Sequence, residues 1–316
     1  MRATPISVII PVRNEGGRVG RTIQSIVSGR SRPFPLEIVV VDDASTDGAC
    51  AQLEPYAAGP QVSLTVRRLG RWSGIPFARN RGAEVASHPI YFITDGNTRF
   101  APNWDLPIWR HFHRGRMLAA TIHDLASPFR GHGCRLMLPA MAVTWLAEPG
   151  VFGGYVPVSA CTGTVIDRSL FHHLGGYDET LPLYGAAEPE FSVRAWLSGY
   201  EIINVPELAI GHRFRPTTEQ NQFLCAHGQL LRSNYLRFAC CYLPEDLLLR
   251  TYDFYAGLAP EEFNACLAQL VAAGVWTQRE TLQRKLRRDF RWFATRFAMI
   301  DAMTDTMTDA PPARPQ

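Results

Sequence analysis

The sequence predicts an α/β fold, in which a mostly parallel β-sheet is flanked by helices and followed by a C-terminal helical extension. Short apolar runs alternate with segments of helical periodicity through the first hundred residues, which is typical of βαβ units. Two of these runs end in acidic residues, and after Pro216 the pattern is helical throughout. We therefore expect an α/β domain over residues 1–215, a helical extension over 216–300 and a disordered tail over 301–316.

Four apolar runs in the first hundred residues predict strands, and three segments between them predict helices. The strands are expected at residues 6–12, 37–41, 63–69 and 89–94. The helices are expected at residues 18–28, from a Ser45-Thr46-Asp47 cap through Tyr56, and at 76–87 with a proline in the first turn. Because such connections make the strands parallel, their carboxyl ends meet at one edge of the sheet, where ligands bind in folds of this kind.

The chain is less regular from residue 100 until the extension begins. Residues 100–160 predict long loops around one helix at 106–114. Strands are then expected at residues 161–166 and 201–205, with helices at 168–174 and 191–197. In the extension, helices are expected at residues 219–241, from Pro244 onward, at 260–273 and at 277–300. The last of these carries an apolar stripe and a strongly basic opposite face.

The composition argues against several classes of protein. With 316 residues and 46% apolar side chains, the chain is long enough for a sizeable core. Its 32 Lys and Arg residues nearly balance 29 Asp and Glu residues, so nucleic acid is not expected as a partner. No run of 18 apolar residues predicts a membrane span, and membrane contact by the basic last helix is not favoured. Seven cysteines without a CxxC pair favour a reducing compartment, so we expect a cytoplasmic protein.

Two polar clusters follow predicted strands. Asp42 and Asp43 come directly after the second strand, where a carboxylate is able to accept hydrogen bonds from a base or a ribose. The alternative for this pair is a helix cap with one extra acid. Asp95 and Asn97 follow the fourth strand, where their oxygens are able to hold Mg²⁺ or Mn²⁺ with the help of a diphosphate. The alternative for this pair is a β-turn.

Three further side chains are candidates for chemistry, each with a structural alternative. Glu188, with Glu190 two residues on, precedes a predicted helix and is either a general base or a helix-capping residue. His212 follows an apolar strand and is either a metal ligand or a structural histidine. Arg79 lies in an early turn of a predicted helix, where its guanidinium suits a phosphate or a base edge, or is solvated.

The order and spacing of these residues resemble glycosyltransferase family 2, the nucleotide-sugar transferases of the GT-A fold. The matching segments are residues 8–15, 38–47, 78–82 and 175–179, with Gly74, Asp95-Gly96-Asn97 in place of the family's DxD motif, Thr162-Gly163 and Glu188-Pro189-Glu190. Residues 205–215, which include Gly211-His212, are similar to the polypeptide N-acetylgalactosaminyltransferases. The resemblance extends over about residues 5–215 and implies a GT-A catalytic domain there.

The resemblance implies a role for each candidate residue. The donor would be a nucleoside-diphosphate sugar, a UDP-sugar if the base that Asp43 receives is uracil. The donor-binding residues would be Pro11, Arg13, Glu15, Asp42, Asp43, Gly74, Arg79 and Asp95. Asp95, Asn97 and His212 would hold Mg²⁺ or Mn²⁺, the Lewis acid that neutralises the departing diphosphate. Glu188 would be the general base of an inverting reaction, since the retaining N-acetylgalactosaminyltransferases carry an amide at this alignment.

Two positions depart from the family pattern. Asn97 stands where the family has Asp or His, so metal binding is expected to depend on His212 and the diphosphate. The segment Ala186-Ala187-Glu188-Pro189 replaces the family's usual Gly-Glu-Asp, with Glu188 at the position of the Asp, which points to an unusual acceptor.

Two hypotheses about function follow. The first is a glycosyltransferase with an unidentified acceptor, which is a small molecule, a glycan or a peptide. The alternative is a non-catalytic nucleotide-sugar-binding module whose extension recruits a partner. If the chain forms a homo-oligomer, we expect the contact to lie in the helical extension. Four aromatic residues are candidates for stacking on the acceptor: Trp104, Trp109, Trp145 and Tyr155.

Overall fold

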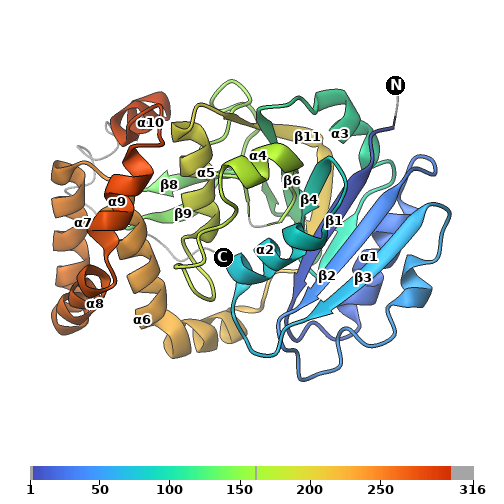
Figure 1. Cartoon of the computed structure of the whole chain (residues 1–316), viewed down its shortest axis with the longest axis horizontal. Helices are drawn as coiled ribbons and strands as arrows, with labels where there is room; N and C mark the ends of the chain where they lie inside the picture. The colour runs from blue at the N-terminus through green and yellow to red at the C-terminus, as the bar shows by residue number, and fades with distance from the viewer. Residues whose placement is uncertain (1–2, 161, 300–316) are drawn as a thin grey trace.

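A central sheet of nine strands runs through the part of the chain that the structure describes (Figure 1). This computed structural model describes residues 3–160 and 162–299. The sheet order is β3-β2-β1-β4-β10-β6-β11-β5, with β7 paired to β6, and β8 and β9 form a separate hairpin. The strands are β1 (Ile6–Val12), β2 (Leu36–Asp42), β3 (Val62–Arg68), β4 (Ile90–Ile93), β5 (Thr98–Phe100), β6 (Arg116–Asp124), β7 (Arg130–Gly131), β8 (Cys134–Met137), β9 (Ala142–Trp145), β10 (Thr164–Asp167) and β11 (Glu201–His212).

Helices cover both faces of the sheet. The α-helices are α1 (Arg18–Ser28), α2 (Ile75–Val85), α3 (Asp105–His111), α4 (Arg168–His173), α5 (Ala187–Leu197), α6 (Thr217–Tyr242), α7 (Glu245–Leu258), α8 (Pro260–Ala272), α9 (Val275–Gln283) and α10 (Phe290–Arg296), and a 3₁₀ turn spans Glu54–Ala57. Helices α1 and α3 pack on one face, while α2, α4 and α5 pack on the other (Figure 1). The prediction of an α/β sheet between helices is thus confirmed.

The first four strands are parallel, as their apolar runs predict. β1 pairs in parallel with β2 and β4, and β2 pairs in parallel with β3. Side chains alternate between the two faces, so Val8 and Ile10 enter one core cluster and Ile9 enters the other. This double burial explains why the run is apolar at every position except Ser7, a buried residue whose hydroxyl donates to Glu37 Oε2. Antiparallel β10 separates these strands from the parallel pair β6 and β11, so the whole sheet is mixed.

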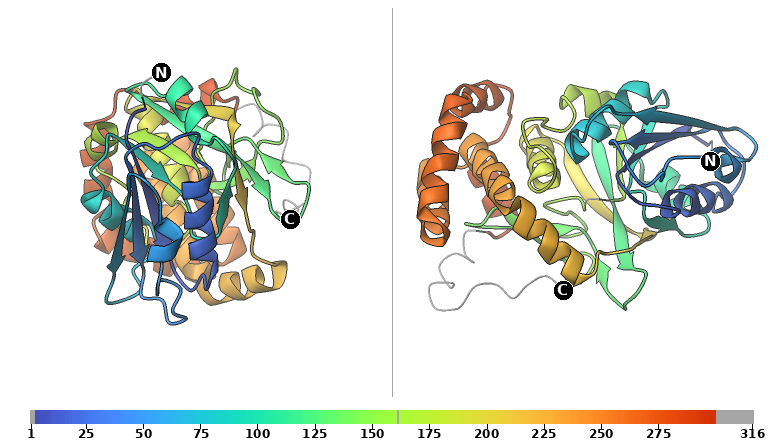
Figure 2. Two further views of the ribbon diagram at one scale, coloured as in Figure 1. Left: turned by 90° about the vertical axis from the view of Figure 1, so that its right-hand side faces the viewer. Right: turned by 90° about the horizontal axis from the view of Figure 1, so that it is seen from below.

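The helical extension packs on one end of the α/β part (Figure 2). One apolar cluster contains Ile9 of β1, Phe191 and Trp196 of α5, and Phe238 and Phe293 of the extension. All five side chains are at most 2% exposed. The apolar core therefore continues from the sheet through α5 into the helices that follow residue 216.

The predicted helix from Ser45 to Tyr56 is wrong. In this segment only the 3₁₀ turn at Glu54–Ala57 forms, and Ala44 and Gln52 have left-handed backbones with φ of 56°. Side chains capture the backbone N–H groups that a helix would use, because Asn14 Oδ1 accepts from Thr46 N and Asp47 Oδ1 accepts from Ala49 N.

Two other predictions need correction. Residues 100–160 hold more than loops around one helix, because β6 lies inside the sheet between β10 and β11, and β7, β8 and β9 follow it. The single helix predicted over residues 277–300 is two helices, α9 and α10. The break arises where the N–H groups of Arg287 and Arg288 both donate to Leu197 O, after which Asp289 caps α10 through Trp292 N.

Element boundaries also shift near the candidate site. Helix α5 begins at Ala187 rather than at Phe191, so Glu188 and Glu190 lie in its first turn. Strand β11 continues to His212, well beyond the predicted end at residue 205. The predicted start of a strand at residue 161 and the predicted tail over 301–316 lie outside the described residues. Among the described helices, none is both long enough and apolar enough to cross a membrane.

Candidate active site

The N-terminus of α2 is fixed by a carboxylate at the end of β2. Asp43 Oδ1 accepts a hydrogen bond from Ser73 N, and Asp43 Oδ2 accepts one from Gly74 N, both at 2.7 Å. Asp43 is 4% exposed. Each oxygen of an ionised carboxylate accepts more than one hydrogen bond, so the carboxylate keeps accepting capacity for a ligand.

At Gly74, the start of α2 lies against the main chain of Leu183, with no room for a side chain between them. Its φ is +96°, and a Cβ built on it would lie 2.3 Å from the backbone nitrogen of Leu183. Ile75 N donates to Leu183 O at 2.9 Å, which ties the start of α2 to the segment that leads into α5. Gly74 therefore has a structural reason to be glycine, apart from any contact with a donor.

We expect Gly74→Ala to lower the free energy of unfolding by at least about 2 kcal/mol, because it combines backbone strain with a clash against main chain. Gly70→Ala is the matched control, since a Cβ there meets nothing within 4 Å and the backbone needs no positive φ. The control should stay within about 0.5 kcal/mol of wild type in urea unfolding. Equal stabilities of the two variants would contradict the assignment.

Arg79, on the second turn of α2, joins two of the predicted acidic residues. Its side chain is fully buried, and its Nη1 donates to Glu188 Oε1 at 2.5 Å. Its Nη2 lies 3.5 Å from Asp95 Oδ1, and its guanidinium stacks over the Tyr177 ring at 5.0 Å. The structure thus brings the ends of β4, α2 and α5 together around one buried cation.

Burial and charge shift the protonation equilibria of this cluster. Burial raises the pKa of Asp95 to about 6, with Glu188 adding to the rise and Arg79 opposing it. Burial by itself would lower the pKa of Arg79, but facing Tyr177, Glu188 and Asp95 raise it above its ordinary value. The arginine therefore remains a cation between the two carboxyl groups.

His212, at the end of β11, faces Asp95. Its Nε2 lies 3.8 Å from Asp95 Oδ2. Burial lowers the pKa of His212 to about 4, against the opposing effects of Glu15 and Asp124, so the imidazole is neutral at pH 7 and keeps a lone pair. Asn97 Nδ2 donates to Arg213 O at 3.1 Å.

Two buried polar atoms in this corner, His212 Nδ1 and Asn97 Oδ1, have no hydrogen-bond partner among the described residues. Buried atoms of this kind call for a further bonding group. Within the described ranges, no three His, Cys, Asp or Glu side chains form a metal cluster, so a metal here would depend on the Asn97 amide as well. One carboxylate, one neutral imidazole and one amide oxygen fit Mg²⁺ or Mn²⁺.

The remaining predicted donor-binding residues lie around the loop after β2. Arg13 Nη1 donates to Asp43 O and Ala44 O, each at 2.7 Å, and its guanidinium lies over the Trp72 ring at 4.4 Å. Pro11 lies within β1. Asp42 Oδ1 accepts from Ser45 N, and Glu15 forms an ion pair with Arg18 at 2.7 Å. These contacts fix the loop, and Asp42 itself is occupied by its own turn.

The cluster contains one residue that the sequence does not predict. The Tyr177 ring stacks on Arg79, and no local pattern indicates this pairing. Glu190 points away from this cluster and forms a buried pair with Arg194 and Tyr242 instead. Two candidate stacking residues are core residues, because Trp104 is 1% exposed and Trp109 is 8% exposed, and each indole N–H donates to a backbone carbonyl.

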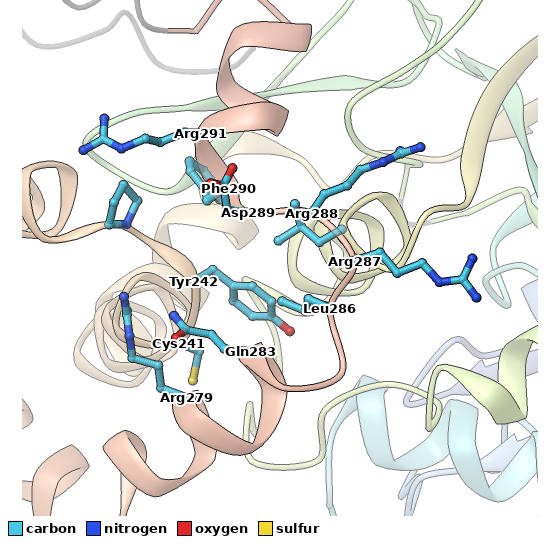
Figure 3. Close-up of a pocket in the computed structure, with 12 residues that line it drawn as sticks. Cys241, Tyr242, Arg279, Gln283, Leu286, Arg287, Arg288, Asp289, Phe290 and Arg291 are labelled. Carbon is cyan, nitrogen blue, oxygen red and sulfur yellow. The ribbon is translucent and has the colours of Figure 1, made fainter.

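A cavity of about 400 Å³ lies in the helical extension and shares no residue with the Arg79 cluster (Figure 3). Tyr242 lines it, and the Tyr242 hydroxyl donates to Glu190 Oε1. The side chains of Arg287, Arg288 and Arg291 extend outward from it in Figure 3. Arg288 stacks on Trp292 and Arg291 pairs with Asp246, so these cations have partners elsewhere.

Comparison with known proteins gives one family. The sequence model described as "Glycosyl transferase family 2" matches residues 7–174, which is more than half of the 316-residue chain. N-acetylgalactosaminyltransferase 6 of Drosophila melanogaster is 28% identical over 91% of this chain, and the human polypeptide N-acetylgalactosaminyltransferase 10 is 27% identical over 92%. The chain spans 44% and 49% of these relatives, about half of their length.

Solved structures share the fold. A crystal structure of GalNAc-T7 with UDP, GalNAc and Mn²⁺ gives a TM-score of 0.74 at 21% identity, over 97% of this chain and 58% of that one. The mannosyltransferase PcManGT from Pyrobaculum calidifontis, in complex with GDP-Man and Mn²⁺, gives a TM-score of 0.57 at 19% identity, over 97% of this chain and 88% of that one. Both similarities place the sheet and its flanking helices in the GT-A fold.

Proposed function

Because the chain belongs to glycosyltransferase family 2, we propose that it transfers a sugar from a nucleoside-diphosphate sugar to an acceptor hydroxyl at the Arg79 cluster. The observation that carries this proposal is the fully buried Arg79 between Glu188 and Asp95, at the carboxyl edge of the sheet. Buried ionisable groups with perturbed protonation equilibria, gathered where strands end, are typical of a functional site in folds of this kind. The comparisons give no support to the non-catalytic alternative.

The donor we propose is a UDP-sugar. The relatives are named for N-acetylgalactosamine transfer, and GalNAc-T7 was solved with UDP, so UDP-N-acetylgalactosamine is the first donor to test. Asp43 would accept from the uracil, next to Pro11, Arg13, Glu15, Asp42 and Gly74. This assignment is supported by the accepting capacity that Asp43 keeps beyond Ser73 N and Gly74 N.

The metal we propose is Mn²⁺ or Mg²⁺, held by Asp95, His212 and Asn97. When bound, such an ion supplies a Lewis acid that neutralises charge on the leaving diphosphate. His212 is suited to this role because it is neutral at pH 7. Arg79 adds a second positive charge beside the same Asp95.

Glu188 would take the proton of the acceptor. Its Oε1 is held by Arg79, whereas Oε2 receives no hydrogen bond within the described part of the chain. The acceptor oxygen would bond to the anomeric carbon as the bond from that carbon to the diphosphate oxygen breaks. The hydroxyl proton would pass to Glu188, and the nucleoside diphosphate would leave with the bonding electrons. Attack from the face opposite the leaving group inverts the anomeric centre.

The remaining parts of the proposal concern the setting of the enzyme. The division at residue 215, the cytoplasmic location and a homo-oligomer through the extension remain our expectations, and we propose no nucleic-acid partner. The six cysteines within the described residues are free thiols, which suits a reducing compartment.

Ligand binding tests the donor and the metal together. We expect UDP with Mn²⁺, at a hundred times its Kd, to stabilise the protein by about 2.7 kcal/mol. Removing Mn²⁺ with EDTA should abolish most of the shift in thermal midpoint, because UDP alone lacks the bridging cation. GDP with Mn²⁺ is the matched control for the base. Absence of a shift with every nucleoside diphosphate, with and without metal, would count against the proposal.

A further inference from the structure

The segment from Pro182 to Ala186 leads into the helix that carries Glu188, and its backbone is strained. Leu183 has φ of 62° and Ala186 has φ of 44°, in the left-handed region that non-glycine residues rarely adopt. Ala186 is also the residue that caps α5, two positions before Glu188. Strained conformations persist only where neighbouring groups hold them, so this segment needs partners on each side.

One side of the segment is held by α2. Ile75 N donates to Leu183 O at 2.9 Å, and Gly74 forms a parallel bridge with Leu183. The same helix carries Arg79, which binds Glu188 Oε1. The start of α2 and the start of α5 are therefore fixed to each other by main chain as well as by the ion pair.

The other side is held by α6, from the helical extension. Asn234 is 2% exposed, and its Nδ2 donates to Pro182 O and to Tyr184 O, each at 2.8 Å. One side-chain amide thus binds two carbonyl oxygens of the strained segment. A buried amide with both protons used in this way fixes the orientation of the backbone that it binds.

The residue after Asn234 reinforces the same contact. A Cβ on Gly185 would lie 3.5 Å from the Tyr235 hydroxyl oxygen. Burial raises the pKa of Tyr235 to about 12, with Glu188 adding to the rise and a hydrogen bond from the Ala186 backbone opposing it. The Tyr235 hydroxyl therefore lies beside the segment, at the residue that caps α5.

We propose that Asn234 is a positioning residue for sugar transfer: through Pro182 O and Tyr184 O, it sets the place of Glu188 relative to Arg79. The inference rests on the proposed function of Glu188. The helical extension then completes the active site by holding its base from outside the α/β part. Small displacements of a catalytic group cause large losses of rate, so a positioning residue affects turnover more than donor binding.

The test compares Asn234→Ala with Gln229→Ala, an exposed amide on the same helix that serves as the matched control. We expect Asn234→Ala to lower kcat for UDP release from UDP-N-acetylgalactosamine by about ten- to a hundredfold. The Kd for UDP with Mn²⁺, measured by calorimetry, should change less than about twofold, since Asn234 touches no predicted donor-binding residue. Amide hydrogen exchange at residues 183–187 should rise at least about tenfold. Asn234→Gln, which keeps the amide donor, should restore part of the rate.

Tyr235→Phe removes one oxygen atom and gives a second variant in case Asn234→Ala does not fold. We expect a smaller fall in its kcat with faster exchange in the same segment. If the wild-type protein is active and these variants keep its kcat and its exchange rates, the positioning role is wrong but the proposed function stands. Wild-type protein that turns over no sugar nucleotide would overturn the proposed function, and the positioning role with it.

Discussion

Arg79→Met is expected to abolish sugar transfer and to lower the free energy of unfolding by about 3–5 kcal/mol. The substitution removes a fully buried cation and leaves Glu188 and Asp95 facing each other without it. Methionine fills a similar volume, so the loss would reflect charge rather than a cavity. Urea unfolding and UDP release from the sugar nucleotide measure the two effects.

Arg81→Ala is the matched control for Arg79. Arg81 lies on the same helix but is partly exposed, and it forms ion pairs with Glu84 and Glu179 at the surface. Exposed pairs contribute about 0–1 kcal/mol, so this variant should remain stable and active. Adding Glu188→Gln to Arg79→Met should recover part of the stability, because it removes one of the unpaired charges. Similar losses in the Arg79 and Arg81 variants would show that the buried cluster has no special role.

Glu188→Gln is expected to reduce turnover by about a hundred- to ten-thousandfold while UDP binding with Mn²⁺ is retained. Glutamine keeps an oxygen that accepts from Arg79, but its amide is unable to take a proton from the acceptor. The substitution therefore removes the proposed base while keeping the hydrogen bond with Arg79. Single-turnover measurement of UDP release and calorimetry with UDP give the two readings.

Glu179→Gln controls for the loss of a carboxylate near α2. Glu179 is exposed and contacts Asn80 and Arg81, outside the cluster. Its variant should turn over at the wild-type rate. A Glu188→Gln variant with full activity would remove Glu188 from the mechanism. Wild-type protein that binds UDP without turning over any donor would favour the binding-module alternative instead.

The parallel half of the fold could be predicted from the sequence because its strands are buried on both faces. In residues 6–12, Ile6, Val8, Ile10 and Val12 enter one core cluster and Ile9 enters the other, which produces an apolar run interrupted only by Ser7. β6 contains a similar apolar run at residues 117–120, but it lies among Trp, His and Pro residues that suggested loops. The helix predicted after Ser45 does not form, because the Asn14 side chain accepts a hydrogen bond from Thr46 N. Asn14 lies in a distant loop, so the local pattern gives no sign of this contact.

The members of the candidate site could be named from motifs, but their contacts could not. Arg79 and Glu188 are 109 residues apart along the chain, and nothing in either local pattern indicates that they bind each other. Asn234 carries still less signal, since a single asparagine within a long helix is ordinarily a surface residue. Such pairings depend on how the sheet and the extension pack, which only the three-dimensional structure supplies.

Helix α2 connects the proposed nucleotide-binding residues to the proposed catalytic residues. Its first residues are fixed by Asp43, and its second turn holds Asp95 and Glu188. If the proposed roles of Asp43 and Glu188 hold, a shift of this eleven-residue helix would alter nucleotide binding and proton transfer together. A substitution that adapts the start of α2 to a new donor would therefore also change the catalytic rate, unless a second substitution near Arg79 compensated for it.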